Sequence, residues 1–214
     1  MKVDLLIEML IDKGVLKFGS FLLNSGRMSP YFFNLGSVDD GKSFRHLGSA
    51  YAERIHQEGF VCDALFGPAY KGIPIAVSTA IALLDLGYNA GVSYNRKEEK
   101  DHGEGGSLVG AELKGQVILI DDVLTSGKAI RKSAELIEAA GASIEGIVIA
   151  LDRKEKLESG KSAAMELSDE LKVPVLSLAT VEDVIDYLQS KQDAELKKAF
   201  KDMEIYRSQF CLDP

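Results

Sequence analysis

Several features that define large classes of proteins are missing from this chain of 214 residues. Its two cysteines, Cys62 and Cys211, are far apart and form no Cys-x-x-Cys pair, so we expect neither a disulfide scaffold nor a zinc site. No apolar run approaches the ~20 residues that a membrane-spanning helix needs. The segment Met1–Asp4 carries an early acid and no signal-peptide cleavage pattern follows it. We therefore expect a cytoplasmic protein without a membrane partner.

The chain also has no excess of basic residues. The chain has 25 Lys and Arg against 33 Asp and Glu, which gives a formal net charge of −8. The one dense basic cluster, Arg96, Lys97 and Lys100, is interleaved with acids. A nucleic-acid partner is therefore not expected, because such binding draws on clustered positive charge. The length allows one α/β domain with a sizeable core and a small accessory lobe.

Two common phosphate-binding motifs, Gly-x-x-x-x-Gly-Lys-Ser/Thr and Gly-x-Gly-x-x-Gly, are also absent. The chain has instead residues 117–129, which read Val-Ile-Leu-Ile-Asp-Asp-Val-Leu-Thr-Ser-Gly-Lys-Ala. The four apolar residues predict a strand buried on both faces, as in the middle of a parallel sheet. Asp121 and Asp122 follow at the edge where open α/β folds bind ligands.

The second half of this run predicts the start of a helix at Thr125-Ser126-Gly127. Free backbone N–H groups and the positive end of the helix dipole make such a start a phosphate site. Carboxylates for hydroxyl groups and amides for a phosphate together suit a ribose 5-phosphate. The alternative is an ordinary strand and helix with an Asp end and a Thr or Ser cap.

The rest of the chain predicts an α/β fold with an open, mostly parallel sheet flanked by helices. A strand–turn–strand pair within residues 15–35 predicts a small lobe outside this sheet, against which the last helix packs. The predicted strands cover 63–66, 90–94, 117–120, 144–151 and 173–179, and the predicted helices cover 3–13, 42–58, 73–86, 162–171, 181–188 and 193–210.

Residues 95–107 hold almost no apolar side chain and predict a long loop. Glycines in it provide hinge freedom, and Lys100, Asp101 and His102 could act on a charged leaving group once such a lid closes. The competing interpretation is a solvated surface loop.

Three other positions suggest ligand contacts. Lys71 at a helix start opposes the dipole, a penalty that a bound anion would remove. Phe32 and Phe33 are adjacent in a predicted strand, so one could be core and the other could stack on a flat ligand. Arg153 follows a strand and could bind a carboxylate through two N–H groups. A plain turn, two core residues and a surface arginine are the respective alternatives.

Read as a set, these segments resemble the orotate phosphoribosyltransferase family, one of the type I phosphoribosyltransferases that bind 5-phosphoribosyl 1-diphosphate (PRPP). The similarity covers nearly the whole chain, in order. It is carried by residues 17–19, 25–27, 29–34, 66–74, 95–97, 100–105, 117–129 and 151–153. The lid sequence and Phe32-Phe33-Asn34 are more specific to this family than the shared PRPP motif.

The resemblance implies a type I phosphoribosyltransferase fold as a single domain, 1–214. Residues 1–36 and part of 152–178 would form a hood, and 60–151 the PRPP-binding core. It implies transfer of the phosphoribosyl group of PRPP to orotate with Mg²⁺ bound through PRPP, not by a direct protein metal site. It also implies a homodimer with shared active sites.

The same resemblance assigns roles to residues. Lys100, Asp101, His102, Asp121 and Asp122 would take part in the chemistry. Phe32, Phe33, Thr125 and Arg153 would bind orotate. PRPP would contact Tyr70, Lys71, Arg96, Lys97, Lys100, His102, Asp121, Asp122, Val123, Leu124, Thr125, Ser126, Gly127, Lys128 and Ala129.

Two alternatives stay open at this point. A purine-type phosphoribosyltransferase would share the PRPP motif, but Phe32, Phe33 and Arg153 disfavour it. A PRPP-sensing regulator would keep the fold with little catalysis, but such a protein usually needs a nucleic-acid surface, which the acidic balance disfavours.

One departure from the family generates a prediction. The family commonly has Lys where this chain has Asn24, and that Lys contacts PRPP. Asn keeps hydrogen bonding but loses the charge. We expect Asn24→Lys to lower the KM for PRPP in steady-state assays, and an unchanged KM would count against this idea.

Overall fold

The main sheet places the predicted ligand-binding edge at its centre. The computed structural model describes residues 2–23, 25–100, 106–124 and 127–213, and within them six strands form this sheet in the order β5-β4-β3-β6-β7-β8. All neighbouring pairs are parallel except the antiparallel pair β4–β5. The strands are β3 (Ala64–Phe66), β4 (Gly91–Lys100), β5 (Gly106–Gly110), β6 (Gln116–Val123), β7 (Ser143–Asp152) and β8 (Val175–Thr180).

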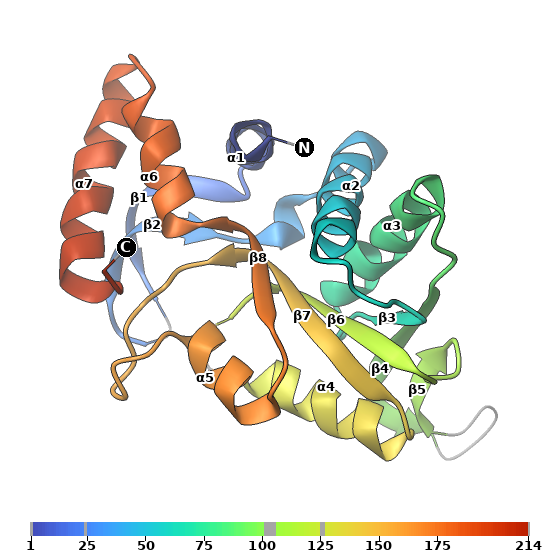
Figure 1. Cartoon of the computed structure of the whole chain (residues 1–214). Helices are drawn as coiled ribbons and strands as arrows, with labels where there is room; N and C mark the ends of the chain where they lie inside the picture. The colour runs from blue at the N-terminus through green and yellow to red at the C-terminus, as the bar shows by residue number, and fades with distance from the viewer. Residues whose placement is uncertain (1, 24, 101–105, 125–126, 214) are drawn as a thin grey trace.

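Helices cover both faces of this sheet (Figure 1). Helices α2 (Gly41–Glu58) and α3 (Gly72–Asp85) lie on one face, and α4 (Lys128–Ala139) and α5 (Ala163–Leu171) lie on the other. The apolar run of β6 is split between the two resulting cores: Ile118 and Ile120 join one cluster, and Val117 and Leu119 join the other. All four are fully buried, which confirms the predicted double-sided strand.

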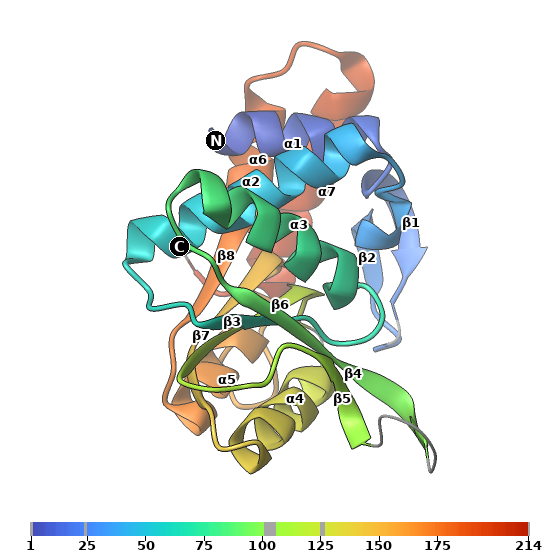
Figure 2. The same cartoon turned by 90° about the vertical axis from the view of Figure 1, so that its right-hand side faces the viewer.

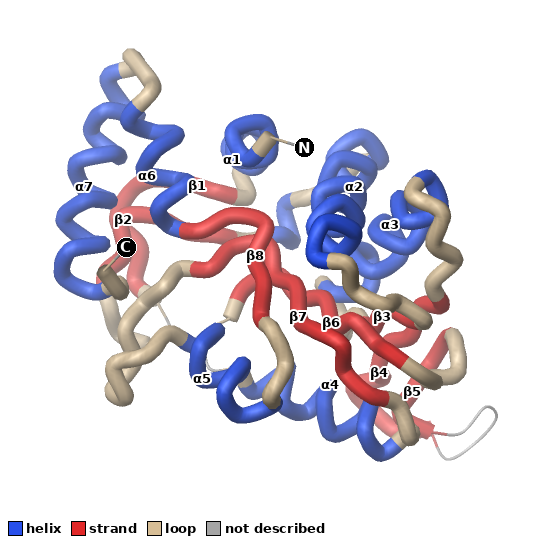
Figure 3. Tube along the Cα trace, in the orientation of Figure 1, coloured by secondary structure: helices blue, strands red, loops and turns tan. Residues whose placement is uncertain are grey.

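A second, two-stranded sheet forms the predicted lobe outside the main sheet (Figure 3). Strand β1 (Leu16–Leu22) pairs antiparallel with β2 (Met28–Phe33), and the short helix η1 (Leu35–Ser37) follows. Helix α7 (Ala194–Phe210) packs on β2, as predicted, and α6 (Val181–Gln189) packs on α7 and on α1 (Val3–Asp12). The open, mostly parallel α/β sheet flanked by helices is thus confirmed. The lobe of β1 and β2 is called the hood below; the predicted hood of residues 1–36 with part of 152–178, and the predicted core of residues 60–151, stay predictions.

Two predictions about strand length were wrong. The central strand continues through Asp121 and Asp122 to Val123, because this end still pairs with β7 in the register Asp121↔Ile149 and Val123↔Leu151. The predicted loop 95–107 is partly a ribbon: β4 runs to Lys100 and pairs antiparallel with β5 at the sheet edge (Figure 2). Strand pairing overrides the polar composition there.

No helix in the described ranges is long and apolar enough to cross a bilayer.

Close packing of α2 against α3 depends on Gly48. A Cβ atom added there would lie 2.4 Å from the carbonyl oxygen of Ser78 on α3. The backbone of α3 would have to move away from the added methyl group, so we expect Gly48→Ala to lower the free energy of unfolding by about 1–3 kcal/mol.

Gly41 provides the matched control, because the same helix begins there and a Cβ would meet nothing within 4 Å. Gly41→Ala should leave the free energy of unfolding unchanged or raise it by up to about 1 kcal/mol. Urea unfolding of the two variants measures the difference, and equal stabilities would show that the helices adjust.

Candidate active site

The chain reverses its direction of winding between β3 and β6, and the loops that leave these two neighbouring strands meet there. Strand β3 is followed by the turn to α3, and β6 carries the two carboxylates just before its last residue, Val123. Lys71 Nζ from the first loop lies 2.8 Å from Asp122 Oδ2 at the end of β6. The Asp122 side chain is 11% exposed and the Lys71 side chain 48% exposed, so the lysine end of the pair is open to solvent. This is where an open α/β sheet places its ligand.

Asp121 has a different environment from its neighbour. Burial, together with the negative charge of Asp122, raises the pKa of the Asp121 carboxyl to about 7. Its backbone carbonyl accepts a hydrogen bond of 2.8 Å from the hydroxyl of Tyr51, a fully buried residue of α2. The two predicted carboxylates therefore differ: Asp122 is paired with Lys71, whereas Asp121 takes up a proton near neutral pH.

A cavity of about 390 Å³ lies at the start of α4, with Asp121 in its lining. Gly127 caps the helix with φ +67°, in the left-handed region that favours glycine. The first helical N–H groups and the dipole make this end attractive to an anion. The cavity is lined by Asp121, Val123, Leu124, Gly127, Lys128, Ala129, Ile130 and Lys132.

A larger cavity of about 550 Å³ lies between the hood and the end of β7. It shares Val123 and Leu124 with the first cavity, so the two meet at the end of β6. Both volumes fall in the range of small-molecule sites. The larger cavity is lined by Leu23, Ser25, Arg27, Phe32, Phe33, Val123, Leu124, Asp152, Arg153, Lys154, Glu155, Lys156, Leu157 and Ala163.

Three of the four predicted base-contacting residues, Phe32, Phe33 and Arg153, line this larger cavity, and the fourth, Thr125, lies outside the described residues. Phe33 is 7% exposed and belongs to the core, whereas Phe32 is 40% exposed and its ring lies 5.6 Å from that of Phe21. The two rings therefore face opposite ways, as the alternation of a strand requires. Arg153 is no surface residue: it is 8% exposed, and its guanidinium lies 4.0 Å from the centre of the Tyr31 ring.

Other predicted contacts are only partly visible. Tyr70 is 65% exposed beside Lys71. Arg96, Lys97 and Lys100 lie in β4, but the side chains of residues 97–100 are outside the description. Asn24, Asp101, His102, Thr125 and Ser126 lie outside the described residues altogether.

Sequence reasoning assigned no role to three residues of this region. Tyr51 looked like a core residue of an amphipathic helix, which it is, and its hydroxyl contact 70 positions away has no sequence signal. Arg27 stands in a turn motif that could have drawn attention to it. Glu155 follows Arg153 by two residues, and only the fold shows that the two are paired at 2.7 Å.

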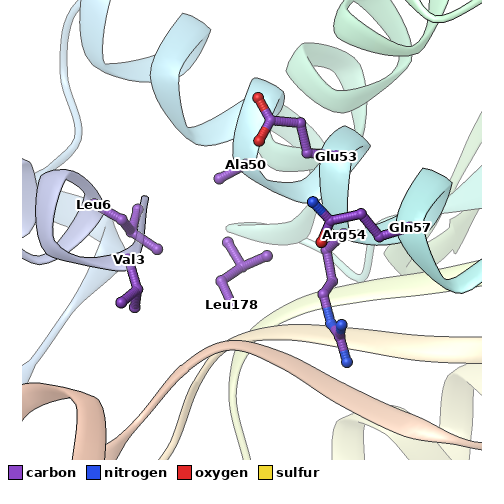
Figure 4. Close-up of a pocket in the computed structure, with 7 residues that line it drawn as sticks. All are labelled: Val3, Leu6, Ala50, Glu53, Arg54, Gln57 and Leu178. Carbon is purple, nitrogen blue, oxygen red and sulfur yellow. The ribbon is translucent and has the colours of Figure 1, made fainter. Parts of the chain in front are cut away.

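A third, much smaller cavity of about 70 Å³ lies among α1, α2 and β8, and none of the predicted site residues lines it (Figure 4). Among the described residues, no cluster of three or more Asp, Glu, His or Cys side chains could hold a metal ion.

Comparison with known proteins fits this geometry. Residues 35–175 match the family model of the phosphoribosyl transferase domain. The chain is 49% identical over 209 residues to orotate phosphoribosyltransferase of Pseudomonas aeruginosa, with 95% of each chain covered. It is 47% identical over 207 residues to the same enzyme of Chromobacterium violaceum, with 97% of this chain and 96% of the relative covered.

The chain belongs to the orotate phosphoribosyltransferase family. A crystal structure of the orotate phosphoribosyltransferase of Francisella tularensis matches it with a TM-score of 0.83 and 35% identity, covering 97% of this chain and all of that one. The expected type I phosphoribosyltransferase fold and the family resemblance are both confirmed.

The high pKa of Asp121 generates a pH-dependent prediction. Between the ordinary value of 3.8 and about 7, the folded state holds a proton that the unfolded state releases. The free energy of unfolding of the wild type therefore falls as pH rises through this window, by up to about 1.4 kcal/mol per pH unit from this group. Asp121→Asn removes this loss, so the variant should be more stable than the wild type at pH 8 by about 2–4 kcal/mol and barely so at pH 4.

Asp122→Asn is the comparison variant: it breaks the ion pair with Lys71 but also removes the charge that helps raise the pKa of Asp121, so its stability should fall less steeply between pH 4 and pH 8 than that of the wild type. Urea unfolding at the two pH values measures both variants. A stability gap between Asp121→Asn and the wild type that does not change with pH would contradict the assignment.

Proposed function

We propose that this chain transfers the 5-phosphoribosyl group from PRPP to orotate, forming orotidine 5′-monophosphate and pyrophosphate, as a step of UMP biosynthesis. The observation that carries the proposal is the meeting of two cavities at Val123 and Leu124, directly beside Asp121 and Asp122. One cavity suits a phosphate and the other a flat base. The carboxylates lie next to the junction, where the ribose that joins phosphate to base would sit.

The phosphate end of the site is the smaller cavity. The 5′-phosphate of PRPP would accept hydrogen bonds from the N–H groups at the start of α4, supported by the positive end of the helix dipole. Lys128 and Lys132 line the same cavity and add positive charge. The residues assigned to this contact are Val123, Leu124, Thr125, Ser126, Gly127, Lys128 and Ala129.

The carboxylates would hold the ribose. Asp121 and Asp122 can accept hydrogen bonds from its hydroxyl groups, and negative charge there favours the positive charge that develops on the ring as the diphosphate leaves. Lys71, already 2.8 Å from Asp122, would turn its remaining N–H groups to the diphosphate next to Tyr70. The pKa of Asp121 near 7 would fall as cationic groups and the sugar replace water around it.

The base end is the larger cavity. Phe32, which is exposed and lines this cavity, would stack on the pyrimidine, and Phe33 would border the base from the core side of the strand. Arg153 would bind the orotate carboxylate through charge-assisted hydrogen bonds, with Thr125 at the ring edge. A buried guanidinium favours a base that carries its own negative charge, which disfavours neutral purines.

The β4–β5 ribbon would act as the lid. It carries Arg96, Lys97 and Lys100, and the connection between its strands carries Asp101 and His102. Closed over the diphosphate, these groups would stabilise the leaving negative charge and exclude water, which otherwise would hydrolyse PRPP.

Mg²⁺ would enter with PRPP. Oxygen-rich ligands and retained waters suit this ion, and the diphosphate and ribose hydroxyls supply them, with Asp121 and Asp122 close by. When bound, it neutralises negative charge on the diphosphate.

We also propose a homodimer in the cytoplasm. Helix α3 exposes an apolar stripe of Val77, Ile81 and Leu84, with exposures of 42%, 64% and 57%. These positions recur at helical spacing, and an exposed apolar stripe of this kind is typical of a protein interface. The stripe lies on the helix that begins beside Lys71, so a second copy seated there would lie near the active site and could share it.

The assay for this function follows orotate absorbance with the purified protein, PRPP and Mg²⁺. Orotate should be consumed only when PRPP is present, and Lys100→Ala should lower kcat by about 100-fold or more, because the lid loses a cation on the departing diphosphate. Lys114→Ala is the control, since this lysine is highly exposed and pairs with Glu112 just beyond β5.

Two outcomes would contradict the proposal. No loss of orotate despite PRPP binding would point to another base or to a PRPP sensor, and competition assays with purine bases would separate these. Full activity of Lys100→Ala would contradict the proposed role of the lid in stabilising the departing diphosphate.

A further inference from the structure

An ionic network connects the base cavity to the C-terminal helix. Glu155 stands at its centre, just beyond β7. Its Oε1 accepts a 2.7 Å hydrogen bond from Arg153 Nε and another of 2.7 Å from the hydroxyl of Tyr206 on α7. Its Oε2 lies 3.4 Å from Arg27 Nη1. The side chains of Arg153 and Glu155 are 9% and 20% exposed, so solvent screens their interaction only weakly.

The position of Arg153 is fixed from several sides. Besides Glu155, its Nη2 donates to the hydroxyl of Ser29 at 3.1 Å, and the Tyr31 ring lies 4.0 Å from the guanidinium carbon. A free arginine loses up to about 2 kcal/mol of rotamer entropy when it is ordered. In this network Arg153 is already ordered in the folded protein, so ligand binding does not have to reduce its conformational entropy, and this favours affinity for the ligand.

The backbone ties the same two segments together. Lys156 N donates to Phe210 O at 2.7 Å, and Leu212 N donates to Lys154 O at 2.9 Å. The Cys211 thiol lies 3.4 Å from the carbonyl oxygen of Arg153. The end of α7 is therefore held against the segment that carries Arg153, and Tyr206 reaches the network from this anchored helix.

We propose that Glu155 and Tyr206 are positioning residues for the base: they act through Arg153 and set how tightly the enzyme binds the carboxylate of orotate. The proposal rests on the proposed function, in which Arg153 binds this carboxylate. Tyr206 orders Glu155, Glu155 orders Arg153, and the C-terminal helix thereby becomes part of base recognition although it does not line the cavity.

Steady-state kinetics of Tyr206→Phe and Glu155→Gln test the proposal. Tyr206→Phe removes only one hydroxyl and should raise the KM for orotate about 5-fold, and Glu155→Gln about 10-fold or more, because hydrogen bonds to charged groups are lost. The KM for PRPP should stay within about 2-fold of the wild type. Tyr187→Phe is the control, since this buried tyrosine lies on α6 with its ring against Lys191.

A double-mutant cycle separates positioning from general stability. In an Arg153→Met background, Tyr206→Phe should leave the KM for orotate unchanged, because the cationic group through which it acts is gone. An equal effect in both backgrounds would overturn the proposal. So would an unchanged orotate KM in Tyr206→Phe, or equal rises in the two KM values.

The failure of this proposal is distinguishable from failure of the proposed function. If the wild type consumes no orotate, the function itself is wrong. If the wild type is active and Tyr206→Phe behaves as Tyr187→Phe does, the network is only structural.

Discussion

A strand whose two faces are buried can carry charged side chains only at its end, and this constraint shapes the whole site. In β6 the run Val117–Ile120 is fully buried between two cores, and charge first enters at Asp121 and Asp122. The neighbouring strand β3 ends at the same edge, so its loop brings Lys71 to Asp122. Burial, together with the negative charge of Asp122, in turn raises the pKa of Asp121 to about 7.

The two cavities follow from the same edge. Helix α4 begins directly after β6, so its N-terminus opens beside the carboxylates and forms the smaller cavity. The hood stands over the end of β7 and closes the larger one with Phe32 and Arg153. The proposed ligand, with a phosphate, a sugar and an anionic base, would lie across these two neighbouring cavities, which share Val123 and Leu124.

The helices and strands that could be predicted from the sequence are those whose pattern of apolar residues indicates which side chains are buried. The apolar run 117–120 and the amphipathic helices are examples, and with them came the open parallel sheet. The extension of β4 to Lys100 was not predictable in this way, because residues 95–100 are polar and give no apolar pattern, and only the pairing with β5 shows the strand. Hydrogen bonds between residues far apart in the chain could not be predicted either. The bonds from Tyr51 to Asp121 and from Tyr206 to Glu155 correspond to no local sequence pattern. Base specificity came from the family resemblance and not from periodicity or charge.

The central claim is that the two cavities form one site that a single nucleotide spans. Calorimetric titration of orotidine 5′-monophosphate, alone and with rising ribose 5-phosphate, tests it most directly. We expect competition: the apparent affinity for the nucleotide falls in proportion to the ribose 5-phosphate added, because both ligands need the N-terminus of α4. An unchanged affinity at saturating ribose 5-phosphate, with both ligands bound together, would contradict it.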